Sequence, residues 1–198
     1  MKTKSVFYNS NIMSDIRVNS KGSKLEKLIV QQAEPWLKMS GDELYALIFP
    51  SCIRRASMVF SSGWCPACKK PVGGYGWIVD PAAHPWKVKC PICNELFPKN
   101  DYKAFYDSGK DEHGLFRYVL ADKRLLYNEE HADKSDPMHR YGVDDGFGYK
   151  EGENTWYFIP TYLLMGVWEK QIFSGIVNLS DAYAITGRIE YARKAAIL

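Results

Sequence analysis

Residues 64–97 read WCPACKKPVGGYGWIVDPAAHPWKVKCPICNELF and contain four of the five cysteines of the chain. Cys65 and Cys68 form one C-x2-C pair, Cys90 and Cys93 form another, and 21 residues separate the pairs. Two intervening residues let a tight turn aim both sulfurs at one ion, and a β-hairpin brings the second turn back to the first. The spacing therefore predicts a zinc ribbon, in which structural zinc is the cofactor and these four cysteines are the metal ligands.

Other interpretations of the cysteines stay open. The segment WCPACK at residues 64–69 is similar to the redox motif of thioredoxins, which needs a helix directly after it. Residues 70–74, KPVGG, disfavour that helix. Two disulfides would be expected if the chain were secreted. His84 is a possible substitute for one thiolate ligand, and Cys52 is predicted to be a buried apolar residue.

Composition and charge narrow the possible classes of protein. The chain has 198 residues, 46% of them hydrophobic, which predicts a folded core. Its net charge of +3 gives no support for nucleic acid or a membrane as the main partner. No apolar run resembles a signal peptide core or a membrane span, so the localisation stays open between the cytoplasm and export followed by removal of a leader.

The sequence pattern predicts a mainly α chain divided into five segments. We expect a flexible N-terminal arm at 1–22, a helical segment at 23–62, the zinc ribbon at 63–106, a long polar loop at 107–154, and helices at 155–198. Ser40 and Glu43 have the spacing of a capping box. Thr186-Gly187 predicts the end of a helix that begins near Thr155, with possible breaks at Gly166 or Gly175, and another helix is expected from Ile189.

The segment from Asn154 to Trp168 is rich in aromatic residues. A helix buried on most sides would explain them. Alternatively, some of the rings line a groove and stack on sugar rings, and Tyr157 and Tyr162 are the predicted substrate-binding residues. Within the ribbon segment at 63–106, short strands are expected at residues 75–79 and 86–89.

Residues 179–196, LSDAYAITGRIEYARKAA, resemble the L-x-D-A-Y-x-x-T-G-D-x-x-Y-A-x-K-A-A signature of α/α-toroid carbohydrate enzymes. The nearest resemblance is to heparinase II/III-like and alginate-lyase-like polysaccharide lyases. Bacterial members carry a C-P-x-C pair, an Asp-Asp-Gly-x-Gly stretch and an aromatic helix in this order, similar to Cys90–Cys93, Asp144–Gly148 and Trp156–Trp168. Arg188 stands where the signature has Asp.

The resemblance implies an incomplete α/α toroid with a small zinc-ribbon insertion, forming the N-terminal part of a lyase. Such enzymes cleave uronic-acid-containing polysaccharides by β-elimination, in which a Tyr or His base removes the C5 proton. Their Asn-His pair and catalytic Tyr lie on later helices, and no segment here matches them, so no catalytic residue is assigned. The segment alone is therefore expected to be inactive. An acidic polysaccharide and the remainder of the toroid are the implied partners, and the helix from Ile189 has no stop signal before Leu198.

A non-enzymatic alternative also fits the sequence. The ribbon and a helical-repeat scaffold could together bind protein or nucleic acid. Five lysines near the cysteines would then form a basic patch for phosphate contacts, namely Lys69, Lys70, Lys87, Lys89 and Lys99.

Overall fold

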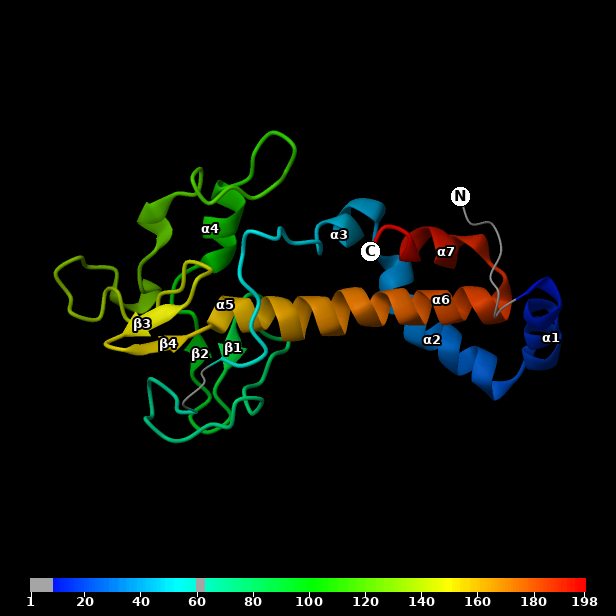
Figure 1. Cartoon of the computed structure of the whole chain (residues 1–198), viewed down its shortest axis with the longest axis horizontal. Helices are drawn as coiled ribbons and strands as arrows, with labels where there is room; N and C mark the ends of the chain where they lie inside the picture. The colour runs from blue at the N-terminus through cyan, green and yellow to red at the C-terminus, as the bar shows by residue number, and fades with distance from the viewer. Residues whose placement is uncertain (1–8, 60–62) are drawn as a thin grey trace. The chain divides into compact units, whose positions relative to one another are not determined.

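A computed structural model of the chain describes residues 9–59 and 63–198 (Figure 1). The chain divides into two compact units, of which unit 1 comprises Met1–Ile48 and Lys170–Leu198, and unit 2 comprises Phe49–Glu169. Helices outnumber strands in the described part, so the prediction of a mainly α chain is confirmed. None of the described helices is both long and apolar enough to cross a membrane.

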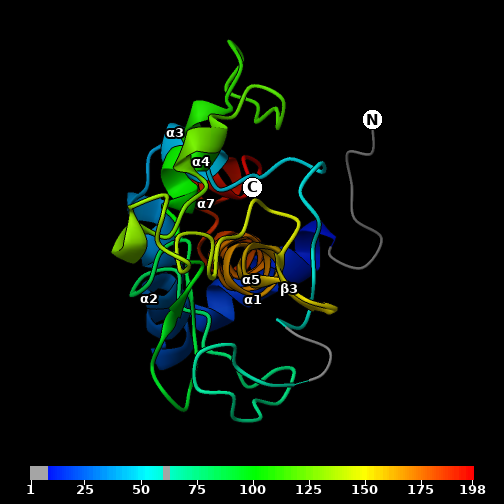
Figure 2. The ribbon, with the colours of Figure 1, turned by 90° about the vertical axis from the view of Figure 1, so that its left-hand side faces the viewer.

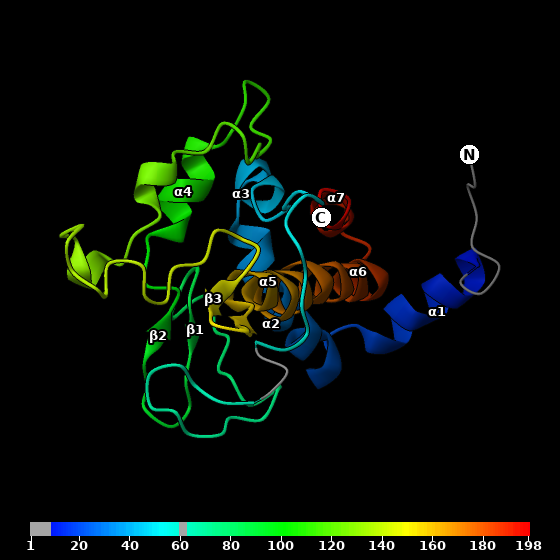
Figure 3. The ribbon, with the colours of Figure 1, turned by 60° about the vertical axis from the view of Figure 1, so that its left-hand side comes forward.

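Unit 1 is built from helices (Figure 3). They are α1 (Ser10–Ser20), α2 (Lys24–Lys38), α3 (Gly41–Tyr45), α6 (Ser174–Thr186) and α7 (Ile189–Ala195). Helix α6 packs against α1, α2 and α7. The fully buried centre of this unit consists of two alanines, one leucine and one large ring, namely Ala33, Ala182, Leu179 and Tyr191. The small side chains let the helices approach closely around the Tyr191 ring.

Helix α1 corrects the prediction of a flexible arm over residues 1–22, of which residues 1–8 lie outside the described residues. The Asn9 side chain accepts hydrogen bonds from the N–H groups of Asn11 and Ile12, so it satisfies donors at the start of the helix. Arg17 fixes α1 to α6 through a 3.2 Å hydrogen bond from Nε to the carbonyl of Ala184. Helix α1 buries none of its residues, which is why the hydrophobic pattern did not reveal it. A mostly apolar groove of about 1010 Å³ lies among α1, α2 and α6.

The capping box predicted at the start of α3 is confirmed. The Glu43 N–H donates to the Ser40 hydroxyl, and the Ser40 N–H donates to the Glu43 carboxylate. Pro35 does not end α2, which continues to Lys38. Residues 57–59 form no strand.

The helical hairpin at the C-terminal side of the chain forms as the sequence predicts. Gly187 adopts a left-handed conformation with φ 73, and its N–H donates to the Tyr183 carbonyl at 2.8 Å. The predicted breaks at Gly166 and Gly175 do not form, because Gly166 lies within the π-helical segment η3 (Tyr162–Phe173) and Gly175 within α6. At Gly175 a Cβ atom would lie 2.6 Å from Trp36 Nε1, so glycine is needed for close packing against that indole.

Unit 2 contains two short antiparallel sheets, whose strands are labelled in Figure 1, and long loops, which Figure 2 shows from another side. Strand β1 (Val88–Lys89) pairs with β2 (Leu96–Phe97), and β3 (Tyr149–Glu151) pairs with β4 (Asn154–Trp156). The other elements are α4 (Tyr102–Ser108), η1 (Lys123–Leu125), η2 (Glu129–His131) and α5 (Phe158–Thr161).

Two boundaries in unit 2 differ from the sequence prediction. The helix begins at Phe158 instead of Thr155, because residues 154–156 are paired in the β3–β4 hairpin. Of the strand expected at residues 75–79, only an isolated bridge between Ile78 and Lys89 forms. Aromatic packing fills the interior, where Phe97 stacks on Phe158 with ring centroids 4.7 Å apart.

Candidate metal centre

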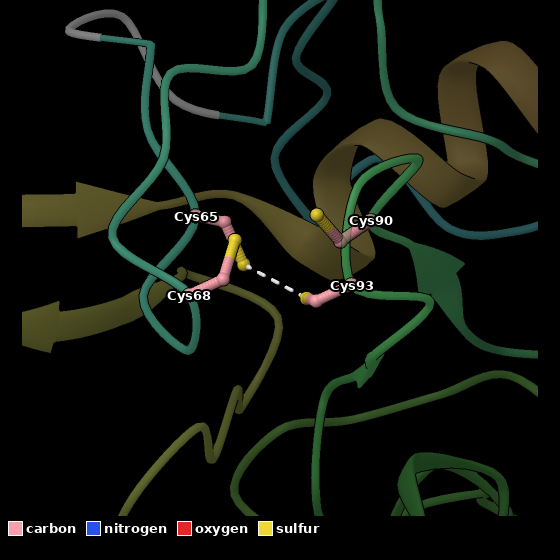
Figure 4. Close-up of side chains that lie close together, drawn as sticks. All are labelled: Cys65, Cys68, Cys90 and Cys93. Atoms are coloured by element: carbon pink, nitrogen blue, oxygen red, sulfur yellow. Dashed lines mark hydrogen bonds between the residues drawn. The ribbon is translucent and has the colours of Figure 1, made fainter.

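The four cysteines of the two C-P-x-C turns lie together in unit 2 (Figure 4). Their Sγ atoms all lie within 4.8 Å of one another, and Cys65 Sγ is 3.8 Å from Cys93 Sγ. A tetrahedral zinc centre with Zn–S bonds of about 2.3 Å places its sulfurs about 3.8 Å apart. Cys65 and Cys90 are buried and Cys68 and Cys93 half-buried, so this group can hold a metal ion at the edge of the unit.

The two turns have the same backbone geometry. The Lys69 N–H donates to the Cys65 carbonyl at 2.9 Å, and the Asn94 N–H donates to the Cys90 carbonyl at 3.0 Å. In each turn, the N–H of the first cysteine donates to the carbonyl five residues later, at 3.0 and 2.9 Å. Lys69 and Asn94 both have a positive φ, 56 and 63. Each turn therefore closes on itself and directs two sulfurs to the same side.

Short strand pairs place the turns. Strand β1 leads directly into Cys90, and its partner β2 follows the second turn. The first turn is bracketed by the bridge between Trp64 and Pro71. The bridge between Ile78 and Lys89 joins the intervening segment to β1, so the chain returns as the spacing of the cysteines predicted.

Backbone donors and burial act on the thiols in opposite directions. Burial raises the pKa of Cys65, and it also raises the pKa of Cys93. A hydrogen bond from the Lys70 N–H lowers the pKa of Cys68. The Ile92 N–H points at Cys90 Sγ from 3.5 Å. N–H groups directed at sulfur favour thiolates, which are the form of cysteine that binds metal.

The structure also bears on the other interpretations of the cysteines. All five cysteines are free thiols, so the two disulfides are not formed. No helix follows Cys68, as a thioredoxin motif would require, because Lys69 is in the left-handed region. His84 is not part of the ligand group found among the described residues. The prediction that Cys52 is buried is wrong, since it is exposed, with Sγ 3.8 Å from the Phe116 carbonyl.

The two predicted substrate-binding tyrosines occupy different environments. Tyr162 is 4% exposed and stacks on Trp86, with centroids 5.5 Å apart. A sugar could reach that ring only after the surrounding aromatic residues moved. Tyr157 is half-buried, and the Arg54 guanidinium lies 4.6 Å from its ring centroid. A ligand stacking on that face of Tyr157 would have to displace the guanidinium.

Asp144, in the Asp-Asp-Gly-x-Gly stretch, organises the surrounding fold, a role that the sequence pattern did not predict. Its carboxylate is fully buried and accepts hydrogen bonds from the N–H groups of Gly146, Gly148 and Ile159, at 2.7, 3.0 and 3.0 Å. Burial raises the pKa of Asp144 to about 6, and these donors oppose the rise. The side chain amide of Asn100 pairs with the Asp144 backbone. One residue therefore joins the ribbon, the glycine-rich loop and the start of α5.

Three of the lysines expected in a basic patch have partners within unit 2. Lys99 pairs with Glu95 and Glu130, and its side chain is 5% exposed. The Lys87 ammonium donates to two backbone carbonyls, at 2.6 and 2.9 Å. Lys69 lies 3.4 Å from a glutamate oxygen. These contacts leave fewer ammonium groups for nucleic-acid phosphates than the lysine count suggests.

The chain was compared with protein-family models, curated proteins and solved structures. It matched no family model, no curated protein and no solved structure.

Proposed function

We propose that the four cysteines bind one zinc ion, and that this ion stabilises the fold of unit 2. The observation that carries the proposal is the sulfur geometry, because the 3.8 Å separation of Cys65 and Cys93 equals that expected across a zinc tetrathiolate. Four protein ligands leave no position for water, so the centre would be structural instead of catalytic. The short strands nearby bury too little apolar surface to hold the turns in place alone.

Metal analysis of the purified chain tests this proposal. We expect one zinc ion per chain after purification without added metal, and thiol reagents should then modify Cys52 faster than the four ligands. Removing zinc with a chelator should make all five thiols reactive. Absence of zinc together with four freely reactive thiols in the folded chain would contradict the proposal.

We also propose that the chain is the N-terminal part of a polysaccharide lyase that acts on uronic-acid-containing polysaccharides. The α6–α7 hairpin supports this, because the residues of the lyase-like signature occupy structural positions. Leu179, Ala182 and Tyr191 form the buried centre with Ala33, and Gly187 makes the left-handed turn between the helices. Arg188, which departs from the signature, bonds with Glu190.

The lyase proposal is tested by β-elimination activity. Cleavage by this route leaves an unsaturated sugar that absorbs ultraviolet light. We expect a protein that carries this chain followed by the catalytic helices to produce such absorbance from a uronate polymer, and the isolated 198-residue chain to produce none. No absorbance from alginate, glucuronan or any glycosaminoglycan would count against a lyase. Salt-dependent binding to a generic oligonucleotide would instead favour the nucleic-acid-binding module.

A further inference from the structure

A cavity of about 340 Å³ lies in unit 2, and none of its lining residues is a cysteine. Its volume is near the lower end of small-molecule sites, about 300 Å³. Arg140 and Lys150 contribute positive charges to the lining, Asp145 contributes a carboxylate, and Phe147 contributes an aromatic ring. The cavity therefore combines charge with an apolar surface.

The positive groups of this cavity are available to a ligand. Arg140 Nη1 donates to the Leu126 carbonyl at 2.6 Å, which orients the guanidinium and leaves its other N–H donors. Lys150, on β3, is exposed. The Asp145 carboxylate already accepts hydrogen bonds on both oxygens, from the Tyr118 hydroxyl at 2.5 Å and the Phe147 N–H at 3.0 Å. With two cations against one bonded carboxylate, the lining favours an anion.

The ring in the lining selects the kind of anion. Phe147 is 45% exposed and contacts Tyr118 edge to face, with centroids 5.2 Å apart. An exposed ring beside charged donors suits a ligand that has both a carboxylate and an apolar ring face. A uronate has this combination, whereas a neutral sugar lacks the carboxylate.

The backbone of the cavity wall is fixed before any ligand binds. Gly148 donates its N–H to the buried Asp144 carboxylate and has φ 108. A Cβ atom there would lie 2.9 Å from Thr155 Cγ2 and 3.0 Å from the Trp156 carbonyl oxygen. A wall segment that is already held in one conformation loses less entropy when a ligand is bound.

We propose that this cavity binds one uronate residue of an acidic polysaccharide, with Arg140 and Lys150 on its carboxylate and Phe147 against its ring. The assignment deepens the proposed polysaccharide-lyase function and rests on it. The cavity is a binding subsite, and no step of bond cleavage is assigned to its residues.

Calorimetric titration of the 198-residue chain, purified with zinc present, tests the subsite. The probes are a glucuronate tetrasaccharide and a glucose tetrasaccharide of equal length. We expect the acidic probe to bind, the neutral probe to bind at least about tenfold more weakly, and Lys150→Gln to weaken acidic binding about tenfold. Phe147→Ala should weaken both probes. Arg140→Gln should act like Lys150→Gln, with circular dichroism checking its fold because Arg140 also bonds Leu126.

The matched control is Lys134→Gln, which removes one exposed positive charge of unit 2 outside the cavity lining. It should leave binding unchanged. Equal weakening by Lys134→Gln and Lys150→Gln would show a general electrostatic attraction of the acidic probe to the protein, and it would overturn the subsite. Equal binding of the two probes, or no binding of either, would also overturn it. Specific binding by a protein without lyase activity would refute the lyase alone. Lyase activity with unchanged binding in Lys150→Gln would refute the subsite alone.

Discussion

Lys69 and Asn94 occupy equivalent positions in the two cysteine turns. Each follows the second cysteine of its turn, donates its N–H to the carbonyl of the first cysteine, and has a positive φ, 56 for Lys69 and 63 for Asn94. Residues other than glycine and asparagine are strained in this left-handed region of the backbone. The repeated turn thus requires an unfavourable backbone conformation at Lys69, which the hydrogen bonds of the turn must maintain.

The Asn94 position gives a direct test of the turn geometry. Replacing Asn94 with Val should destabilise zinc-loaded unit 2 by roughly 1–2 kcal/mol, because a β-branched side chain crowds the backbone at positive φ. Asn94→Gly is the control and should be neutral or slightly stabilising. Denaturant unfolding at fixed zinc concentration measures both variants, and equal stabilities would argue against the left-handed conformation.

Loss of one metal ligand should unfold unit 2 locally. We expect Cys65→Ser to abolish zinc binding and to remove the near-ultraviolet circular dichroism of the packed aromatic rings, because metal binding is coupled to folding. Cys52→Ser is the matched control, since it removes an exposed thiol outside the centre. A Cys65→Ser chain that retained both zinc and the aromatic signal would show that the ion is not held as proposed.

Asp144 should make stability depend on acidity. Burial raises its pKa from 3.8 to about 6, so the folded state holds the proton more tightly than the unfolded state. Its contribution is therefore fully present below about pH 4 and is lost as the pH rises through about 6. The shift of about 2 pKa units corresponds to roughly 3 kcal/mol.

Unfolding curves between pH 4 and 7 check the role of Asp144. The difference in stability between the original chain and Asp144→Asn should change across this window, because the variant cannot titrate there. Glu153→Gln, at an exposed position, should run parallel to the original chain. Parallel curves for Asp144→Asn as well would mean that the carboxyl group has the same pKa in both states.

Lys99 should contribute through charge as well as packing. Burial lowers the pKa of Lys99, but hydrogen bonds to the carboxylates of Glu130 and Glu95 outweigh burial. The net effect raises the pKa, so the ammonium stays charged. Lys99→Met keeps most of the aliphatic stem and should cost roughly 1–2 kcal/mol through the lost ion pairs. Lys99→Ala should cost more. Thermal unfolding compares the two, and identical midpoints would assign the whole effect to charge.

Gly187 should be intolerant of side chains. Gly187→Ala places a Cβ at φ 73, so it should destabilise unit 1 by about 1 kcal/mol. Gly73→Ala is a suitable control, because Gly73 lacks a positive φ and a Cβ there would meet no atom within 4 Å. Thermal unfolding followed by the helical signal is the measurement. An unchanged midpoint for Gly187→Ala would contradict the turn between α6 and α7.

Local patterns in the sequence were sufficient where one short segment controls the geometry. The cysteine spacing identified the four possible ligands, Ser40 and Glu43 identified a capping box, and Gly187 identified the end of a helix. In each case the necessary atoms lie within a few residues of one another. Neither the identity of an ion nor that of a substrate follows from local backbone geometry.

The sequence by itself identified the four clustered cysteines and the helix caps, whereas the tertiary structure decided what surrounds them. The Asn100 side chain bonds the Asp144 backbone, and the Asp144 carboxylate accepts a hydrogen bond from the Ile159 N–H. Because these residues are distant in the sequence, no periodic pattern shows that they meet. Burial of Tyr162 and exposure of Cys52 likewise depend on neighbours from other segments. A side chain's solvent exposure is a property of the packed interior, and only the folded chain brings that interior together.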